Sequence, residues 1–240
     1  EIIGILDNTP IYKPYFFGGR LSIFNPKLIE NIDFYPGGYD ARANQSLSGI
    51  IDVKTKDGNY QEFEGEIEIN LTDMNSVFSM PIEKDKSSLL VSYRRSWYDL
   101  LISAMASESD SAMALTFIEA FQSKYTNKLT KDHKLTINLA GFHEGVATEL
   151  SKENSNDSSI EGEWNYDSKR IISSIQLDSI INKELVNNIT FSYNKWDAFY
   201  KLGGDMDMDS EAKAETITIR DDLTYELNDS HKLQFGGLFY

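Results

Sequence analysis

Apolar and polar residues alternate along most of the chain, from about Gln61 to its end. Successive side chains of a β-strand point to opposite faces, so this period of two predicts strands with one apolar and one polar face. The pattern predicts nine strands, over residues 61–71, 75–82, 88–98, 117–129, 134–147, 166–181, 185–199, 213–227 and 231–240.

Residues 61–71 illustrate the two faces. Phe63, Ile67 and Ile69 share one face, whereas the other face carries glutamates at 62, 64, 66 and 68. A half-buried sheet of a soluble protein also has one polar face. Three features favour a transmembrane β-barrel instead: several segments run to a dozen residues or more, the polar faces are heavily charged, and aromatic residues recur near strand ends.

The connections between the segments alternate in length. Short turns are expected at 83–87, 130–133, 182–184 and 228–230, and long polar stretches at 99–116, 148–165 and 202–212. Short periplasmic turns and long extracellular loops alternate in this way in outer-membrane barrels. The predicted fold is therefore all-β dominated, a transmembrane antiparallel β-barrel with about nine strands in this chain. Because single-chain bacterial barrels have an even number of strands, we expect the chain to be a piece of a longer protein.

Composition and motifs narrow the possible functions. The formal net charge of −15 at pH 7 would repel phosphates, so no nucleic-acid partner is expected. The chain has no cysteine, which excludes disulfides, thiolate metal sites and a cysteine nucleophile. No Ser–His–Asp arrangement and no acid pair for glycoside hydrolysis emerges. We therefore expect no enzyme activity, no metal and no cofactor.

One acidic stretch leaves an alternative open. Asp205, Asp207 and Asp209 have the D-x-D-x-D spacing of calcium loops, but the glycine and the bidentate glutamate of an EF-hand are missing at the expected offsets. Acidic residues in an exposed loop are ordinarily solvated by water, and this is the interpretation that we adopt.

The first sixty residues lack the alternation. Short strands are expected at Ile3–Leu6, Ile32–Tyr35 and Ile50–Lys54, among turns rich in glycine and proline. Asn25 and Pro26 are suited to the N-cap and the first position of a short helix. This stretch is predicted to form a small mixed α/β unit.

Three runs in this unit resemble the plug domain of TonB-dependent outer-membrane receptors. Leu6-Asp7-Asn8-Thr9-Pro10-Ile11 is similar to the (I/L)DG(V/I)P segment of that family, with Asn8 in place of its glycine. Residues 28–42 resemble its stretch I-E-I-E-V-x-x-G-(P/G)-x-x-A-R-Y-G, although Ala43 and Asn44 stand where the final Tyr-Gly is expected. Residues 47–56 are similar to the end of the plug, G-G-V-I-(N/D)-(I/V)-x-T-K.

The resemblance implies an organisation and a function. Residues 1–60 would be the C-terminal part of the plug, and residues 61–240 the first part of a barrel that has about 22 strands in this family. The implied function is an outer-membrane receptor that binds a scarce nutrient outside the cell and imports it through rearrangement of the plug. The implied partners are the inner-membrane TonB complex, a small-molecule or glycan ligand, and outer-membrane lipid. The alternatives are an outer-membrane barrel with an adhesive or structural role and a soluble β-rich binding module.

The resemblance also suggests residues that bind the ligand. Plug loops of the family touch ligand at the extracellular side, and the loop after the first run carries Tyr12, Tyr15, Phe16 and Phe17. The alternative is that these aromatic side chains pack the core of the plug.

Arg42 is the candidate for a contact between plug and barrel. A guanidinium group pairs bidentately with a carboxylate, and the first barrel strand would point its glutamates, including Glu64 and Glu66, toward the plug. The alternative is an arginine that meets only water.

Overall fold

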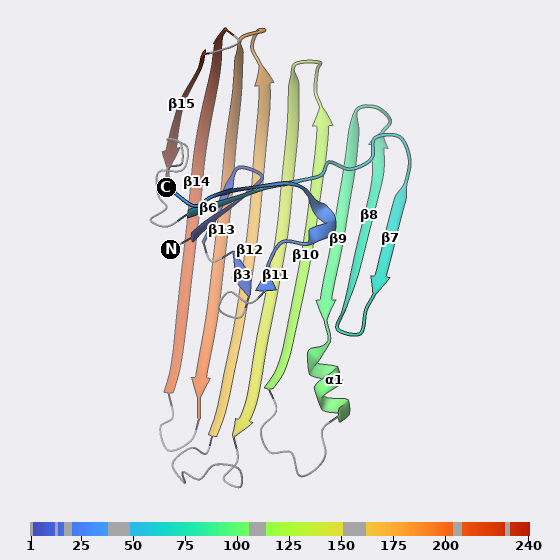
Figure 1. The fold of residues 1–240 in the computed structure, drawn as a ribbon, viewed down its shortest axis with the longest axis vertical. Helices are drawn as coiled ribbons and strands as arrows, with labels where there is room; N and C mark the ends of the chain where they lie inside the picture. Colours follow the sequence, from blue (N-terminus) through green and yellow to red (C-terminus); the bar gives the residue numbers. More distant parts are fainter. Residues whose placement is uncertain are drawn as a thin grey trace.

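A computed structural model of the chain describes residues 2–12, 14–16, 21–37, 49–105, 114–150, 162–203, 208–228 and 231–240. These residues form a nine-stranded sheet, a four-stranded sheet and a two-stranded hairpin. Figure 1 shows the nine strands side by side as a tall wall, with the smaller sheet lying across its face. We call the nine-stranded sheet the wall, and the described residues between 2 and 55 the plug.

The wall contains the nine strands that the alternation predicts, which confirms that prediction. Each strand pairs antiparallel with its neighbours in the sequence. The strands are β7 (Glu64–Ile69), β8 (Asp73–Glu83), β9 (Ser87–Ser96), β10 (Ala114–Lys128), β11 (His133–Leu150), β12 (Gly162–Ile180), β13 (Leu185–Leu202), β14 (Met208–Asn228) and β15 (His231–Phe239). β7 and β15 lie at opposite edges of the sheet, so the wall is an open part of a barrel.

The short turns from β8 to β9, β10 to β11 and β12 to β13 lie at one end of the wall, which we call the turn end (Figure 1). The other end, which we call the loop end, carries the short turn from β7 to β8 and the strand ends that lead into the long connections. Helix α1 (Tyr98–Met105) follows β9 at the loop end. No helix among the described residues is long and apolar enough to span a membrane. The strands reach further into the loops than predicted: Thr148 of β11 still pairs with Trp164 of β12. Backbone pairing needs no apolar face, so the ladder continues after the apolar alternation ends.

Burial in the wall is inverted relative to a soluble sheet. On the face opposite the plug, Ile175 and Phe191 are 51% and 46% exposed. Their neighbours on the plug side, Ser174 and Thr190, are 3% and 1% exposed. A contiguous apolar surface of this extent is unfavourable in water and favourable in the hydrocarbon of a bilayer. The outer face of the wall is therefore that of a transmembrane barrel.

A row of charged and ionisable side chains crosses the outer face on the loop side. Cross-strand pairing places one residue from each of β9 to β14 in this row: Arg95, Glu119, His143, Lys169, Asp197 and Lys213. Arg95 Nε lies 3.1 Å from Glu119 Oε1 within it. Because charged groups are costly in hydrocarbon, the row marks the end of the apolar part of the outer face on β9 to β12. On β13 and β14 the charged pair Lys195–Glu215 lies one outer row nearer the turns.

The plug is built on one mixed sheet in the order β2-β1-β6-β5. Its strands are β1 (Ile2–Leu6), β2 (Thr9–Tyr12), β5 (Ile29–Tyr35) and β6 (Gly49–Thr55), and the hairpin β3 (Tyr15–Phe16) and β4 (Leu21–Ser22) lies beside it. β1 and β6 pair in parallel. The sequence predicts β1, β5 and β6 but not β2, β3 or β4, which are too short to show a period.

The short helix expected after Asn25 is a 3-10 turn, η2 (Pro26–Leu28). The side-chain oxygen of Asn25 accepts a hydrogen bond from Lys27 N at 3.1 Å, as an N-cap does. Asn25 Nδ2 also donates to Ser92 Oγ of the wall at 2.8 Å. One residue therefore ends the preceding loop and fixes the turn to β9.

An apolar cluster joins the plug to the middle of the wall. The plug contributes Leu6, Ile11, Phe16, Ile23, Phe24 and Val53, and the wall contributes Ile118, Ala120, Ala140, Phe142 and Ile172. The rings of Phe16 and Phe142 meet edge to face, with centroids 6.1 Å apart. The plug-facing side of β10 to β12 is thus apolar where the plug rests on it, which the alternation does not predict.

Spin labels at Ile175 and Gln176 test the two faces of the wall. In lipid bilayers, a label at Ile175 should be relaxed mainly by oxygen, which concentrates in hydrocarbon, and a label at Gln176 mainly by a water-soluble nickel chelate. Power-saturation electron paramagnetic resonance measures both. Equal water accessibility at the two positions would contradict the assignment of the faces.

Candidate functional site at the contact between plug and wall

Residues 56–63 lead from the plug to β7, and we call them the exit segment. This segment is fixed to the turn end of the wall. Tyr60 Oη donates to Thr126 Oγ1 at 2.9 Å, and the Lys128 ammonium lies 4.1 Å from the centroid of its ring. A Cβ added at Gly58 would lie 3.0 Å from Ser88 Oγ and the backbone of Leu89. Glycine therefore allows the backbone to lie directly against β9. This anchorage limits movement of the plug at its C-terminal end.

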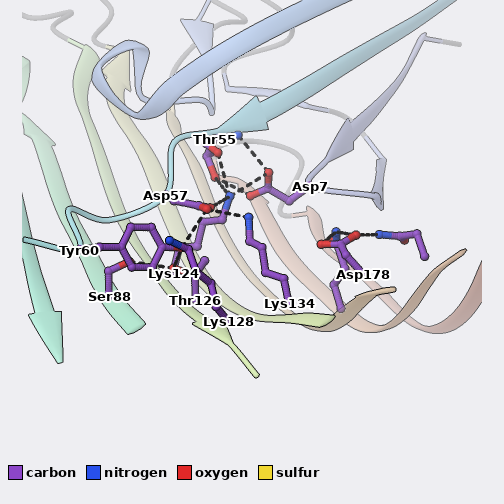
Figure 2. A network of polar contacts seen from close by, with 12 residues as sticks. Asp7, Thr55, Asp57, Tyr60, Ser88, Lys124, Thr126, Lys128, Lys134 and Asp178 are labelled. Atoms are coloured by element: carbon purple, nitrogen blue, oxygen red, sulfur yellow. Dashed lines mark hydrogen bonds and ion pairs between the residues drawn. The ribbon is translucent and has the colours of Figure 1, made fainter. Parts of the chain in front are cut away.

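Lys124 connects the wall to three parts of the plug and its exit segment (Figure 2). The residue lies on β10 and is 8% exposed. Its ammonium donates to Thr55 O at 2.8 Å and to Thr55 Oγ1 at 3.2 Å. Carboxylate oxygens of Asp7 and Asp57 lie 3.5 and 3.3 Å from Lys124 Nζ. A buried ammonium with several oxygen partners is compensated for the water that it loses.

Asp57 is shared by two lysines of the wall. Lys134 Nζ of β11 lies 2.6 Å from Asp57 Oδ2, whereas Lys124 approaches the other oxygen, Oδ1. Partial burial acts to raise the pKa of Asp57, but the hydrogen bond from Lys134 and the charges of Lys124 and Lys134 outweigh it and lower the pKa. The carboxylate therefore stays ionised at neutral pH and holds the exit segment against β10 and β11.

The turn between β1 and β2 reaches across the wall with two side chains. Asp7 and Asn8 have φ angles of 43° and 66°, which is the left-handed region that Asn and Asp tolerate best after glycine. The carboxylate of Asp7 accepts hydrogen bonds from Thr55 N at 3.0 Å and Thr55 Oγ1 at 2.5 Å. The Asn8 amide donates to Asn188 of β13. The residue that replaces the family's glycine thus adds a contact with the wall.

Asn188 belongs to a chain of hydrogen bonds on the wall. Its amide donates to Asp178 of β12, and its side-chain oxygen accepts from Thr190 Oγ1 at 3.1 Å. Gln176 Nε2 donates to the two oxygens of Asp178 at 2.9 and 3.1 Å. Figure 2 shows Asp178 apart from the lysine cluster, on the neighbouring strands.

A polar cavity of about 440 Å³ lies between these groups. The plug and exit segment line it with Asp7, Asn8, Glu30, Lys54, Thr55 and Asp57, and the wall with Lys124, Lys134, Thr136, Gln176, Asp178, Val186, Asn188, Asp222 and Thr224. Nearly all of these side chains carry oxygen or nitrogen, so the cavity is suited to water and polar solutes.

A second group of side chains lies on the loop side of the plug, on the plug-facing side of β11 to β13. The rings of Tyr166 and Tyr200 are 4.9 Å apart. Tyr166 Oη donates to Glu144 Oε1 at 2.9 Å, and Trp196 Nε1 donates to Ser168 Oγ at 2.9 Å. Pairing places these residues in adjacent rows of the three strands. Aromatic faces with polar tips are typical of ligand-binding surfaces.

Of the residues predicted to bind ligand, Tyr15 lies near this group. Tyr15 is half-buried and lies within electrostatic range of Arg170 of β12, which also lies near Tyr166 and Glu144. Phe16 is buried against Phe142 in the apolar cluster. Phe17 lies outside the described residues, and the structure describes only the backbone of Tyr12.

The predicted plug–barrel contact is described on its barrel side alone. Arg42 lies outside the described residues. Glu66 accepts a hydrogen bond from Lys27 of the plug, and Glu68 lies 2.5 Å from the same ammonium. Hydrogen bonds to Glu66 and Glu68 raise the pKa of Lys27. Glu64 instead accepts from Asn59 Nδ2 at 2.7 Å, in the exit segment.

Lys124 and Asn188 are functional candidates that the sequence reasoning missed. Both lie on the polar face of a predicted strand, so the alternation of faces predicts that they point toward the plug. Nothing in the alternation distinguishes the rows that touch the plug from the rows that do not. Asp205 and Asp207 lie outside the described residues, and within the described ranges no cluster of three or more candidate ligands could hold a metal.

Comparisons with known proteins support the fold. No family model matches the chain. No curated protein matches it either. The siderophore receptor PirA from Acinetobacter baumannii matches 98% of this chain with a TM-score of 0.70 and 12% identity, over 39% of its own length. The ferric enterobactin receptor PfeA from Pseudomonas aeruginosa matches 98% with a TM-score of 0.65 and 11% identity, over 40% of its length. FpvA from P. aeruginosa, bound to iron-loaded pyoverdine, matches 98% with a TM-score of 0.63 and 13% identity, over 34%.

The chain has the fold of TonB-dependent outer-membrane receptors, as the three runs in its plug suggest. It spans about two fifths or less of the length of each receptor that it matches. PirA and PfeA are named as receptors, for siderophores and for ferric enterobactin.

Removal of the Lys124 ammonium should loosen the plug. Lys124→Met removes the only ammonium that the described residues place beside the largely buried Asp7 carboxylate and leaves Asp57 with Lys134 alone; breaking a buried ion pair costs about 3–5 kcal/mol. We expect faster proteolysis of the plug in the folded receptor, measured by limited trypsin digestion in detergent. Lys131→Met, in an exposed turn, is the control. Equal cleavage of the two variants would show that Lys124 does not hold the plug.

Acid should weaken the same contact. Because the folded pKa of Asp57 is lower than its ordinary value of 3.8, its contribution is complete above pH 3.8 and is lost as the pH falls through the folded pKa. Cleavage of the plug by pepsin, an acid protease, should therefore rise below pH 3.8. In Asp57→Asn this rise should be smaller, since the carboxyl that titrates is absent. An identical acid profile for both proteins would contradict the role of Asp57.

Proposed function

We propose that the chain is part of a TonB-dependent receptor that imports a small molecule across the outer membrane. Residues 1–60 form the C-terminal part of the plug, and residues 61–240 begin the barrel. The observation that carries the proposal is the inverted wall, apolar outside and polar inside, with a separate sheet resting on its polar side. A soluble binding module has no use for such an outer face, and among the matched structures named above none is an adhesin.

The aromatic group on the loop side supports an iron–siderophore complex as the ligand. Tyr166, Tyr200 and Trp196 lie close together on β12 and β13, and Arg170 lies within electrostatic range of Tyr166 and of the plug residue Tyr15. Such a surface suits a ligand with flat unsaturated groups and negative charge. The matched proteins are named as siderophore or ferric enterobactin receptors, which agrees with this class.

The mechanism follows from the position of the plug. Ligand binds on the loop side, where these side chains meet, and the plug separates it from the cavity on the turn side. Work by the TonB complex on the plug would then loosen the polar contacts of the turn side, among them those of Lys124. The protein makes or breaks no covalent bond in this cycle, so we propose a transporter and not an enzyme.

Uptake in a defined host tests the function. The full-length receptor is expressed in a Gram-negative host that lacks its own siderophore receptors, with and without TonB. We expect radioactive iron from ferric enterobactin or ferric pyoverdine to enter only when TonB is present. Uptake that does not depend on TonB, or surface adhesion without uptake, would contradict the proposal.

Tyr200→Ala should weaken ligand binding. The change removes one ring of the Tyr166–Tyr200 pair, and an aromatic contact of this type contributes about 0.5–1.5 kcal/mol. We expect an increase in Kd of about two- to twelvefold, measured by binding of the radioactive complex to whole cells. Phe199→Ala on the outer face of the same strand is the matched control. Equal effects of the two variants would exclude a role for Tyr200 in binding.

A further inference from the structure

One carboxyl group lies among the apolar side chains of the outer face. Asp221 of β14 is in register with Ile189 of β13 and Gly237 of β15. Residues in register share a face, and Ile189 is 43% exposed on the face that meets hydrocarbon. Asp221 is likewise exposed. Because the structure describes both strands beside β14, this outward position rests on described residues alone.

Asp221 lies near the middle of the membrane. Two apolar outward residues flank it on each side along β14, Ile217 and Ile219 toward the loops and Leu223 and Tyr225 toward the turns. Outward residues recur about every 6.6 Å along a strand, so Asp221 is about 20 Å along β14 from the charged residue Glu215. At a strand tilt of about 40° this is a depth of about 15 Å, in an apolar belt about 25 Å tall.

No other carboxyl or ammonium group among the described residues of β10 to β14 shares this setting. Between the charged groups of the loop side and the short turns, the other outward positions carry apolar residues, tyrosine, serine, asparagine or glycine, apart from His133 at the start of β11. An ionisable side chain in hydrocarbon is costly, and where one occurs it ordinarily has a partner and a function. Asp221 therefore requires hydrogen-bonding partners within the membrane.

Asn187 of β13 supplies one of these partners. It is in register with the outward residue Leu223, and its Nδ2 donates to Asp221 Oδ1 at 2.6 Å. Asp221 Oδ2 accepts no hydrogen bond from the described residues. The amide of Asn187 carries a second N–H hydrogen and an acceptor oxygen. The pair thus offers both a donor and an acceptor to whatever meets the outer face.

Gly237 leaves the carboxyl group uncovered on the side of β15. A glycine contributes no side chain to the outer face, so another surface can approach Asp221 closely there. Ile189 and Phe235, 43% and 57% exposed, supply apolar surface beside it. Membrane proteins associate through this combination, in which small residues permit close packing and polar side chains form hydrogen bonds across the contact.

We propose that the outer face around Asp221 and Asn187 is an interface between two copies of the receptor within the membrane. In this contact Asp221 of one copy accepts a hydrogen bond from Asn187 of the partner subunit, and the reverse bond forms across a two-fold axis. A second copy fits because the pair presents a donor and an acceptor together, which is what a self-complementary contact needs. The proposal goes beyond the proposed function and needs no cargo.

Association in lipid tests the interface. Full-length receptor, labelled with a donor or an acceptor dye, is placed in vesicles of phosphatidylethanolamine and phosphatidylglycerol, and energy transfer gives the Kd of association. One hydrogen bond between membrane proteins changes association by about three- to thirtyfold, and the contact holds two. Asp221→Leu should therefore raise the Kd by about tenfold or more.

Ser123→Leu is the matched control, since it makes a polar-to-leucine change at an outward position of β10. Its Kd should stay within about twofold of that of the unaltered receptor. Equal Kd values for the two variants, or an unaltered receptor that remains monomeric, would overturn the proposal.

Thermal unfolding separates the interface from a role inside one barrel. Leucine suits hydrocarbon, so the Asp221→Leu barrel should unfold in detergent at a temperature no lower than that of the unaltered barrel. A lower unfolding temperature together with unchanged association would show that Asp221 serves its own barrel, and would overturn the proposal.

Cross-linking in intact outer membranes tests which surfaces meet. This chain has no cysteine, and any cysteine elsewhere in the receptor is changed to serine. A short bismaleimide should join two copies of Ile189→Cys, beside Asp221, in at least about fivefold higher yield than two copies of Ile137→Cys, outward on β11. Addition of Asp221→Leu should remove the difference. Equal yields from Ile189→Cys and Ile137→Cys would overturn the proposed interface.

Discussion

The structure depends on one constraint, that each wall strand must suit two different surroundings at once. Every second side chain meets the outside of the sheet, and the others meet the plug or the space around it. The backbone ladder fixes this division, because a shift of one residue in any strand would exchange its two faces. The paired rows from β9 to β14 keep the same register over long distances, so apolar rows, charged rows and plug contacts align across the strands.

The constraint leaves the inner face free to vary from row to row. In one part of it, Ala120 and Phe142 pair across β10 and β11 and give the plug an apolar seat. Two rows nearer the turns, Lys124 and Asn138 pair in the same strands and give a polar contact. A single pair of strands thus carries both an apolar and a polar part of the contact. The plug is held by contacts in several rows of the wall as much as by the strength of any one bond.

These observations explain how much of the structure could be predicted from the sequence. The period of two predicts all nine wall strands and their faces, because it is a property of each strand alone. The Asn25 cap is also local, and it is present as predicted. Lys124 and Asn188 escape prediction because their partners lie more than sixty residues away in the sequence. The apolar seat of the plug escapes it for the same reason: Ala140 is indistinguishable from its neighbours until the plug is placed against it.

The lengths of the wall strands have a consequence for what the cell surface presents. β12 has 19 residues, so at about 3.3 Å per residue it is about 60 Å long. With a tilt of about 40°, it rises about 45–50 Å along the barrel axis, whereas the apolar belt of an outer-membrane barrel is about 25 Å tall. In the proposed membrane setting, much of the strand length beyond this belt extends past the charged row on the loop side, as a rigid ring of paired strands. Antibodies and bacteriophages would meet this rim of paired strands before they reach the lipid.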